Sequence, residues 1–386
     1  MKYIIRTIQY VVGVLFIVSG LVKANDPLGL SYKMQEFFEL WTGSLRSGHF
    51  FIRSGLVRLL DVLHDHSLAL AIFMIVLEII TGVALVLGWR KKMILSVLLP
   101  LMVFFTFLTG YAYLSGKFTN CGCFGDCLPI TPITSFSKDV ILLVLILLLI
   151  AGRSFIHTVT NGTIALRILL LSLLISIGIQ WYVLNYLPLA DCLPFKRGNN
   201  ISTEMKPPPN SVPDSFAIKF IYEKMGKRYE FSPENLPADF NSYKFIDRKQ
   251  ELIRKGNAEP AIKGFSLTGI TGEDSTAEVL QEPNAILFFL QYYQNPDAWL
   301  SGLKTLVNDS HQKNIPVYII TSDIAGVQKV LAINHINCEV FTCDFTVIRT
   351  AARTNPTVYI IKQGTIIDKF GLRNIGAADK EIMNLN

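Results

Sequence analysis

Long apolar runs separated by short polar segments fill the first half of the chain. Five of these runs lie near residues 4–23, 68–88, 93–115, 139–156 and 165–188, and each approaches the ~20 residues that a helix needs to cross ~30 Å of hydrocarbon. The first run follows a basic start but precedes no small-residue cleavage site, so we interpret it as an uncleaved anchor. The pattern predicts an α-helical membrane bundle of four to five spans.

The loop between the first two runs follows a different pattern. Its stretches "YKMQEFFELW" and "FFIRSGLVRLLDVL" carry apolar residues at helical spacing. This spacing predicts two amphipathic helices lying at the outer membrane surface.

The second half of the chain mixes strand and helix patterns. From about residue 260, buried strands such as "NAILFFLQ" and "PVYIITSD" flank the amphipathic helix "DAWLSGLKTLVNDSHQ", and "TVYIIKQGTIIDKF" forms a closing hairpin; this order predicts an α/β sandwich. We therefore predict four parts: a membrane domain over 1–190, a Pro-, Asn- and Ser-rich linker over 191–212, a hairpin and helix subdomain over 213–259, and the α/β domain over 260–386.

Composition and charge agree with a membrane protein. The chain is 51% hydrophobic and 17% charged, and its net charge of +6 comes from residues that often lie at the ends of apolar runs, which indicates helix orientation rather than nucleic-acid binding. Short loops bearing Lys2, Arg6, Arg90 to Lys92, Arg153 and Arg167 mark the cytoplasmic side. In a bacterial cell this places the protein in the inner membrane, with the C-terminal domain in the periplasm.

All six cysteines then lie outside, in an oxidising compartment. In "NCGCFGDC", Cys121 and Cys123 could close a small, strained and therefore easily reduced disulfide, with Cys127 as the resolving thiol. Purely structural bridges, or a metal site completed by Cys192, are the alternatives; because no histidine lies nearby, we assign no metal. Cys192 is otherwise a partner thiol for this cluster.

Two further cysteines lie on either side of a short strand in "NCEVFTCD". Two thiols five residues apart in an oxidising compartment rarely both stay free. The sequence therefore predicts a structural disulfide between Cys338 and Cys343, which requires their Cα atoms to lie within ~7 Å.

Glu78 lies in the middle of the second run. A charged carboxylate there costs ~2.5 kcal/mol or more, so we expect it to be protonated or paired inside the bundle. If a quinone accepts electrons from the thiols, Glu78 could relay the released protons; the alternative is a packing hydrogen bond to Ser19 or Thr106. No cofactor is assigned beyond this conditional quinone. Lys23 and Asp26, at the outer end of the first run, could equally be an interfacial anchor and a helix stop before Pro27.

The α/β layout resembles the thioredoxin fold. Pro356 in "RTNPTVYII" stands where the thioredoxin family keeps a cis-proline beside its active site. The Cys-x-x-Cys pair of that family would fall in "QYYQNPDAW", which contains no cysteine. The resemblance therefore implies an α/β thioredoxin-like domain without the usual redox pair.

The membrane half resembles the DoxX and MauE group of redox-associated membrane proteins, and the whole chain resembles long DoxX-family proteins of Bacteroidetes. The residues that carry this likeness are "SGLVKANDPLG", Glu78 in its span, and "CGCFGD". The resemblance implies disulfide formation in periplasmic partners, or a quinone-linked redox function.

Two functions remain open at this point. The first is thiol-disulfide exchange at the periplasmic face, with Cys121, Cys123, Cys127 and Glu78 as catalytic candidates. The second is a non-enzymatic scaffold for an envelope complex, which the missing Cys-x-x-Cys favours. Both imply the lipid bilayer and a periplasmic protein or envelope complex as partners.

Overall fold

The computed structural model describes residues 1–47, 53–118, 127, 130–237, 239–254 and 256–384. Within these residues, five helices are long and apolar enough to cross a membrane, as the sequence predicts. They are α1 (Lys2–Ala24), α4 (Ser67–Leu87), α5 (Lys91–Ser115), α6 (Pro132–Ala151) and α7 (Gly162–Tyr186).

The fourth span begins earlier than its apolar run. The Thr131 side chain accepts a hydrogen bond from the Thr134 backbone N–H, and Pro132 occupies the first helical position. This cap starts α6 in the polar segment ahead of the apolar residues. After α6, the short 3₁₀ helix η1 (Arg153–Phe155) leads to α7.

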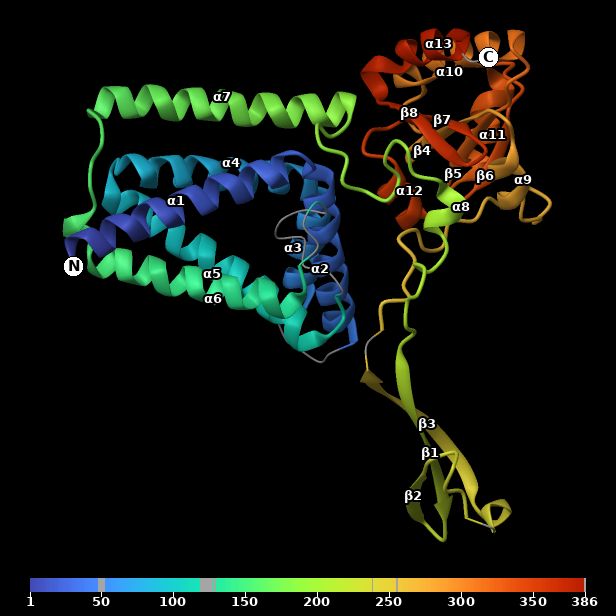
Figure 1. Ribbon diagram of the computed structural model, residues 1–386, viewed down its shortest axis with the longest axis horizontal. Helices are drawn as coiled ribbons and strands as arrows, with labels where there is room; N and C mark the ends of the chain where they lie inside the picture. Colours follow the sequence, from blue (N-terminus) through green and yellow to red (C-terminus); the bar gives the residue numbers. More distant parts are fainter. Residues whose placement is uncertain (48–52, 119–126, 128–129, 238, 255, 385–386) are drawn as a thin grey trace.

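The five spans form a bundle in which α7 stands apart. α1 packs closely on α4, where Gly13 and Gly82 allow the backbones to approach. α7 runs beside the bundle (Figure 1), and only 17% of its most apolar window is buried.

The two predicted amphipathic helices are present as α2 (Pro27–Ser47) and α3 (Arg53–Asp65). They lie across one end of the bundle, where α1 and α5 end and α6 begins (Figure 1). We call this the cysteine end, because Cys127 lies between α5 and α6. The basic residues Lys2, Arg90 and Arg153 belong to the opposite end.

The C-terminal domain is built on a five-stranded sheet with the order β6-β5-β4-β7-β8. β4, β5 and β6 are parallel, whereas β7 and β8 run antiparallel. The strands are β4 (Ala285–Leu290), β5 (Val317–Thr321), β6 (Glu339–Thr342), β7 (Thr357–Lys362) and β8 (Thr365–Phe370). The helices are α9 (Thr276–Gln281), α10 (Leu300–Gln312), α11 (Ile324–Ile333), α12 (Phe345–Ala351) and α13 (Ile375–Asn384), with the 3₁₀ turns η3 (Pro296–Ala298) and η4 (Leu372–Asn374).

This domain has the predicted thioredoxin-like fold. Parallel strands joined by helices precede the antiparallel hairpin, and the Asn355–Pro356 bond before β7 is cis. β4 is buried throughout, because Phe288 packs in the core of one sheet face and Phe289 in that of the other. Alternating side chains of a strand point to opposite faces, so a strand covered on both sides is apolar at every position.

The segment expected to be a linker contributes to this domain. Phe195 and Ile201 are buried in its core, and α8 (Ile201–Glu204) forms within the segment. Part of the predicted linker, residues 191–212, therefore belongs to the folded α/β domain.

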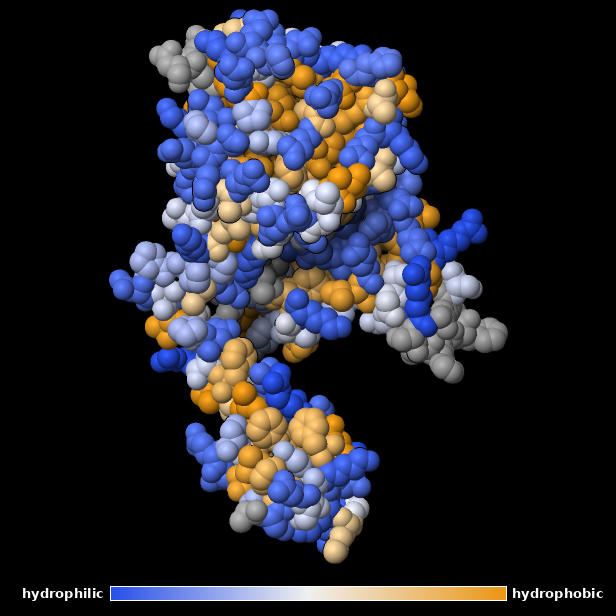
Figure 2. Space-filling model, turned by 90° about the vertical axis from the view of Figure 1, so that its right-hand side faces the viewer, coloured by the Kyte–Doolittle hydropathy of each residue, from blue (hydrophilic) through white to orange (hydrophobic). Residues whose placement is uncertain are grey.

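Residues 215–254 form a projecting arm. The helix predicted within this segment is wrong, because its residues form a strand. The arm is a three-stranded sheet of order β2-β1-β3, made of β1 (Ser215–Lys224), β2 (Lys227–Phe231) and β3 (Lys244–Arg254), with the turn η2 (Phe240–Ser242). β3 pairs along its length with β1, and this pairing overrides the local helical preference of its Lys, Glu and Gln residues. Hydrophobic residues gather on the arm (Figure 2), including the exposed Phe216, Phe245 and Ile253.

Candidate functional site at the cysteine end

A disulfide joins the two halves of the molecule at the cysteine end. Cys127, from the segment between α5 and α6, bonds to Cys192, which follows α7, with their Cα atoms 4.7 Å apart. The Cys192 residue is exposed and Cys127 is half-buried. The predicted catalytic residues Cys121 and Cys123 lie outside the described residues, so their pairing stays a prediction.

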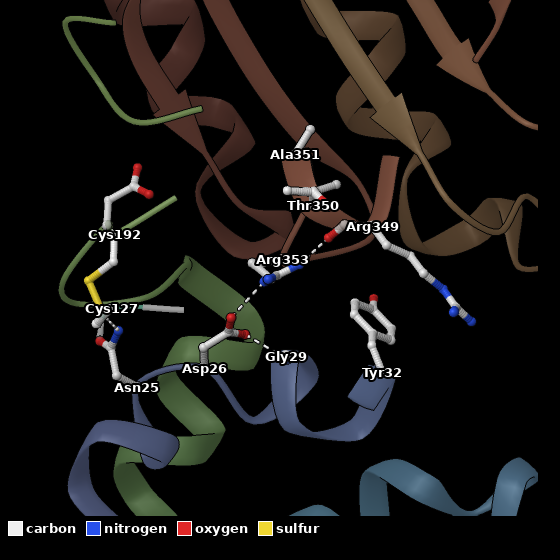
Figure 3. A network of polar contacts seen from close by, with 12 residues as sticks. Asn25, Asp26, Gly29, Tyr32, Cys127, Cys192, Arg349, Thr350, Ala351 and Arg353 are labelled. Atoms are coloured by element: carbon white, nitrogen blue, oxygen red, sulfur yellow. Dashed lines mark hydrogen bonds and ion pairs between the residues drawn. A yellow bond between two sulfur atoms is a disulfide. The ribbon is translucent and has the colours of Figure 1, made fainter. Parts of the chain in front are cut away.

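Asn25, the residue after α1, holds the chain on both sides of this bond (Figure 3). Its Nδ2 donates to the Ala190 carbonyl at 2.8 Å, and its Oδ1 accepts from the Ala190 N–H at 2.9 Å. The same Nδ2 lies 3.9 Å from Cys127 Sγ. One amide side chain therefore fixes the disulfide against the end of the first span.

The neighbouring Asp26 connects the bundle to the α/β domain. Its Oδ1 accepts from the Gly29 N–H at 3.0 Å, which caps the start of α2, and its Oδ2 lies 2.8 Å from Arg353 Nε. Both side chains are nearly inaccessible to solvent. Arg353 stands three residues before the cis-proline, so this ion pair anchors the cis-proline loop on the membrane bundle (Figure 3).

α2 contacts this pole of the α/β domain through Tyr32. The Tyr32 hydroxyl donates to Gln291 Oε1 at 2.9 Å, and the Arg349 guanidinium lies 4.5 Å from the centre of the Tyr32 ring. Burial raises the pKa of Tyr32 to about 12, so its hydroxyl keeps its proton for this bond at neutral pH.

Gln291 directly follows β4, at the place where a thioredoxin Cys-x-x-Cys pair would stand. Its backbone N–H donates to Asn355 Oδ1 at 2.9 Å, and its Nε2 donates to the Ala352 carbonyl at 2.6 Å. The position where the redox thiols would stand therefore carries an amide instead, and it faces the membrane bundle.

Glu78 is paired inside the bundle, which is one of the two states expected for it. Its partner is Lys23, and neither Ser19 nor Thr106. Its two carboxylate oxygens lie 2.8 and 2.6 Å from Lys23 Nζ. Lys23 also donates to Ser19 Oγ at 3.0 Å and lies 4.7 Å from the centre of the Phe105 ring. Thr106 instead donates to the Met102 carbonyl of its own helix.

Lys23 is therefore not the interfacial anchor we expected, because it turns inward from the end of α1 to neutralise Glu78. A second carboxylate, Asp139, is buried nearby; its Oδ2 accepts from Thr109 Oγ1 at 3.0 Å, and its Oδ1 lies 2.8 Å from Lys138 Nζ. A small cavity of about 30 Å³ lies beside both groups, which is room for a water molecule but not for an aromatic ring.

The predicted disulfide between Cys338 and Cys343 is wrong, since both are free thiols. Cys338 packs with the core on one face of the sheet and Cys343 with the core on the other. Residues separated by an odd number of positions along a strand point to opposite faces. The strand between these cysteines therefore keeps their sulfur atoms apart.

The sequence patterns do not mark Asn25, Tyr32, Gln291 or Arg353 as residues of the site. The polar Asn25-Asp26 pair directly after an apolar run was a usable signal. The other three act through contacts between distant parts of the chain, which no local pattern reveals. Among the described residues, no group of three or more His, Cys, Asp or Glu side chains could hold a metal ion.

Two family models match parts of the chain. Residues 1–152 match the methylamine utilisation protein MauE. Residues 216–255, which cover the arm, match a domain of unknown function (DUF8463). No curated protein matches the chain.

Solved structures resemble the C-terminal domain. A thiol-disulfide oxidoreductase from Bacteroides fragilis is 21% identical, with 30% of this chain and 96% of that chain covered and a TM-score of 0.25. Copper-bound Sco1 from yeast is 19% identical, with coverage of 31% and 84% and a TM-score of 0.26. A thiol:disulfide interchange protein from a Bacteroides species is 9% identical, with coverage of 31% and 86% and a TM-score of 0.26.

Proposed function

Since residues 1–152 form a MauE-type membrane region, we propose that this multi-pass membrane protein catalyses thiol-disulfide exchange at its cysteine end, facing the periplasm of a bacterial cell. The protein combines a bundle of membrane-spanning helices with a thioredoxin-like domain. Exchange with a periplasmic protein is the specific activity that we propose.

One observation carries the proposal: the exposed disulfide between Cys127 and Cys192. It lies where the chain leaves the membrane, next to the predicted Cys121 and Cys123 pair in sequence. Thiol-disulfide exchange requires a sulfur atom that an incoming thiolate can reach. Because Cys192 is the more exposed of the two residues, we propose that its sulfur atom is the one attacked.

The proposed exchange conserves electrons and atoms. A partner thiolate attacks Cys192 Sγ, the bond to Cys127 breaks, and Cys127 leaves as a thiolate; a second partner thiolate then displaces Cys192. The partner gains a disulfide, and its two electrons now reside on Cys127 and Cys192. A disulfide between Cys121 and Cys123 would reoxidise them, and a membrane quinone would take the two electrons and two protons in the last step.

The buried Lys23 and Glu78 pair supports a proton-handling role in that last step. Charged groups inside a span are costly and usually functional. The water-sized cavity beside the pair suits proton transfer, whereas it is too small to hold a quinone ring. We therefore assign Glu78 to proton relay and place no quinone at this position.

A scaffold function is the second candidate, because the thioredoxin-like domain turns its usual active pole toward α2, and Gln291 follows β4 where a Cys-x-x-Cys pair would stand. In that case the disulfide between Cys127 and Cys192 would be a structural link. The two functions differ in how easily the bond is reduced.

The test is a redox titration of the full-length protein in membranes, with alkylation of free thiols and a non-reducing gel. Exchange-active disulfides have potentials well above the ~−300 mV of structural ones, so we expect Cys127 and Cys192 to open in a glutathione buffer. Cys192→Ser should also abolish oxidation of an added reduced peptide dithiol.

Cys338→Ser is the matched control, because Cys338 is a half-buried free thiol that packs against the core of the α/β domain. It should oxidise the peptide like the wild type. Two results together would contradict exchange and favour the scaffold. The disulfide between Cys127 and Cys192 would stay oxidised until the buffer potential falls below ~−300 mV, and Cys192→Ser would oxidise the peptide like the wild type.

A further inference from the structure

A cavity of about 450 Å³ lies between the end of α7 and the α/β domain. This volume is within the ~300–1,000 Å³ typical of small-molecule sites. One wall consists of Tyr182, Tyr186 and the segment 187–189; the other contains Asp191, Lys196, Arg197, Lys369 and Asn374.

The cavity has an excess of positive charge. Arg197 pairs with Asp368, and Lys369 Nζ lies 2.8 Å from Asp191 Oδ2. Lys196 is exposed and forms no ion pair with any described residue. Since the Arg197 side chain is 60% exposed despite its partner, its remaining N–H groups and the Lys196 ammonium can reach an anion.

The position of the cavity relates it to the membrane surface. Tyr182 and Tyr186 stack at 4.9 Å at the end of α7, and Trp181 lies 6.3 Å from Tyr186. Aromatic residues at a span end mark the headgroup layer of the bilayer. The cavity therefore opens at the depth of lipid headgroups.

The outer surface of α7 leads to the cavity from the hydrocarbon side. Leu170, Leu171, Leu174 and Ile175 are each at least half exposed along this weakly packed span. Acyl chains lying along this surface would bring their glycerol and phosphate groups to Tyr182 and Tyr186. A free phosphate ion would gain nothing from this apolar surface.

We infer that the cavity binds the phosphate headgroup of an anionic phospholipid, with Lys196 and Arg197 contacting the phosphate and α7 contacting the acyl chains. A guanidinium binds phosphate through two parallel hydrogen bonds, and an ammonium adds a point charge. Basic pockets beside transmembrane helices are a recurrent form of lipid recognition. The bound lipid would fill the space between the weakly packed α7 and the α/β domain, and this role is independent of the proposed redox function.

The experiment uses the delipidated full-length protein in detergent, with native mass spectrometry to count bound lipids during titration. The probes are phosphatidylglycerol, phosphatidylcholine and glycerol 3-phosphate. We expect phosphatidylglycerol to bind more tightly than phosphatidylcholine, and glycerol 3-phosphate not to compete at equal concentration. Competition by glycerol 3-phosphate would show that the site takes soluble phosphates and would overturn the lipid assignment.

Variants locate the binding. Each removed charge should weaken phosphatidylglycerol binding about fivefold, so the Lys196→Gln, Arg197→Gln double variant should lose about 30-fold. The control replaces the identical dipeptide Lys227 and Arg228 on the arm by glutamines, and it should bind like the wild type.

If the double variant fails to fold through loss of the Arg197 pair, Lys196→Gln alone still tests the site, because it breaks no ion pair among the described residues. An equal loss in the arm control, or none in Lys196→Gln, would overturn the inference.

Discussion

Two of the four cysteines in the described part of the chain remain thiols, and their surroundings explain why. Cys338 Sγ lies 3.0 Å from the Val317 carbonyl oxygen, and Cys343 is buried in the opposite core. Burial raises the pKa of Cys338 to about 12 and that of Cys343 to about 11. Because the thiolate is the reactive form, both thiols are unreactive at neutral pH.

This gives a prediction for alkylation. After mild reduction at pH 8, iodoacetamide should modify Cys192 and Cys127 in the folded protein but leave Cys338 and Cys343 unmodified, since a raised pKa keeps a thiol protonated far below it. Peptide mass mapping before and after denaturation measures the labelling, and denaturation should make all four reactive. Fast native labelling of Cys343 would contradict the burial described above.

At the scale of elements, the contact of α1 with α4 depends on two glycines. A Cβ atom added to Gly82 would lie 2.8 Å from the Gly13 carbonyl oxygen, and one added to Gly13 would lie 2.5 Å from a Val86 methyl group. Small residues let membrane helices approach closely where no hydrophobic effect drives association. The glycines therefore set the separation of the two helices that carry Lys23 and Glu78.

Gly82→Ala should destabilise the bundle, because the carbonyl it meets belongs to a helix backbone that cannot turn away. Overpacking of this kind costs about 1–3 kcal/mol, which thermal unfolding in detergent would reveal as a lower Tm. Gly178→Ala on α7 is the control, since a Cβ there meets no atom within 4 Å. Equal Tm values for both variants would show that the helices can separate without cost.

Helices and strands were predictable from the sequence where a local pattern determines them. The residues of the candidate site were not, because they meet through contacts between distant parts of the chain. The spans follow from length and hydropathy, and the thioredoxin-like sheet from its buried strands and Pro356. β3 was mistaken for a helix because its pairing with β1 connects residues far apart in sequence. The pairing of Lys23 with Glu78 spans 55 positions, and only the packing of α1 on α4 brings these residues together.

At the scale of the whole molecule, one buried ion pair connects the membrane bundle to the α/β domain. Asp26 and Arg353 are 327 positions apart and almost fully buried. Removing one partner of such a pair leaves an uncompensated buried charge, which typically costs about 3–5 kcal/mol. The ion pair therefore matters more to docking than any exposed contact between the two parts.

Asp26→Asn should loosen the docking while leaving the α/β domain folded. We expect faster hydrogen exchange in α2 and α12, because Tyr32 of α2 and Arg349 of α12 are in contact beside the ion pair, and unchanged exchange in β4. The control is Glu259→Gln, whose ion pair with Lys263 is half exposed on both sides and contributes little. An unchanged rate of hydrogen exchange in α12 of the Asp26→Asn variant would show that other contacts are enough to hold the two parts together.

The bond between Cys127 and Cys192 also constrains how the chain threads the bilayer. Two sulfur atoms can share a covalent bond only if both lie in one aqueous compartment, so the chain between them must cross the membrane an even number of times. Residues 127 to 192 contain the two apolar helices α6 and α7. Parity thus requires α7 to cross the membrane whenever α6 does. If α1, α4 and α5 cross as well, the chain crosses five times, and the start of α1 and the α/β domain lie on opposite sides of the membrane.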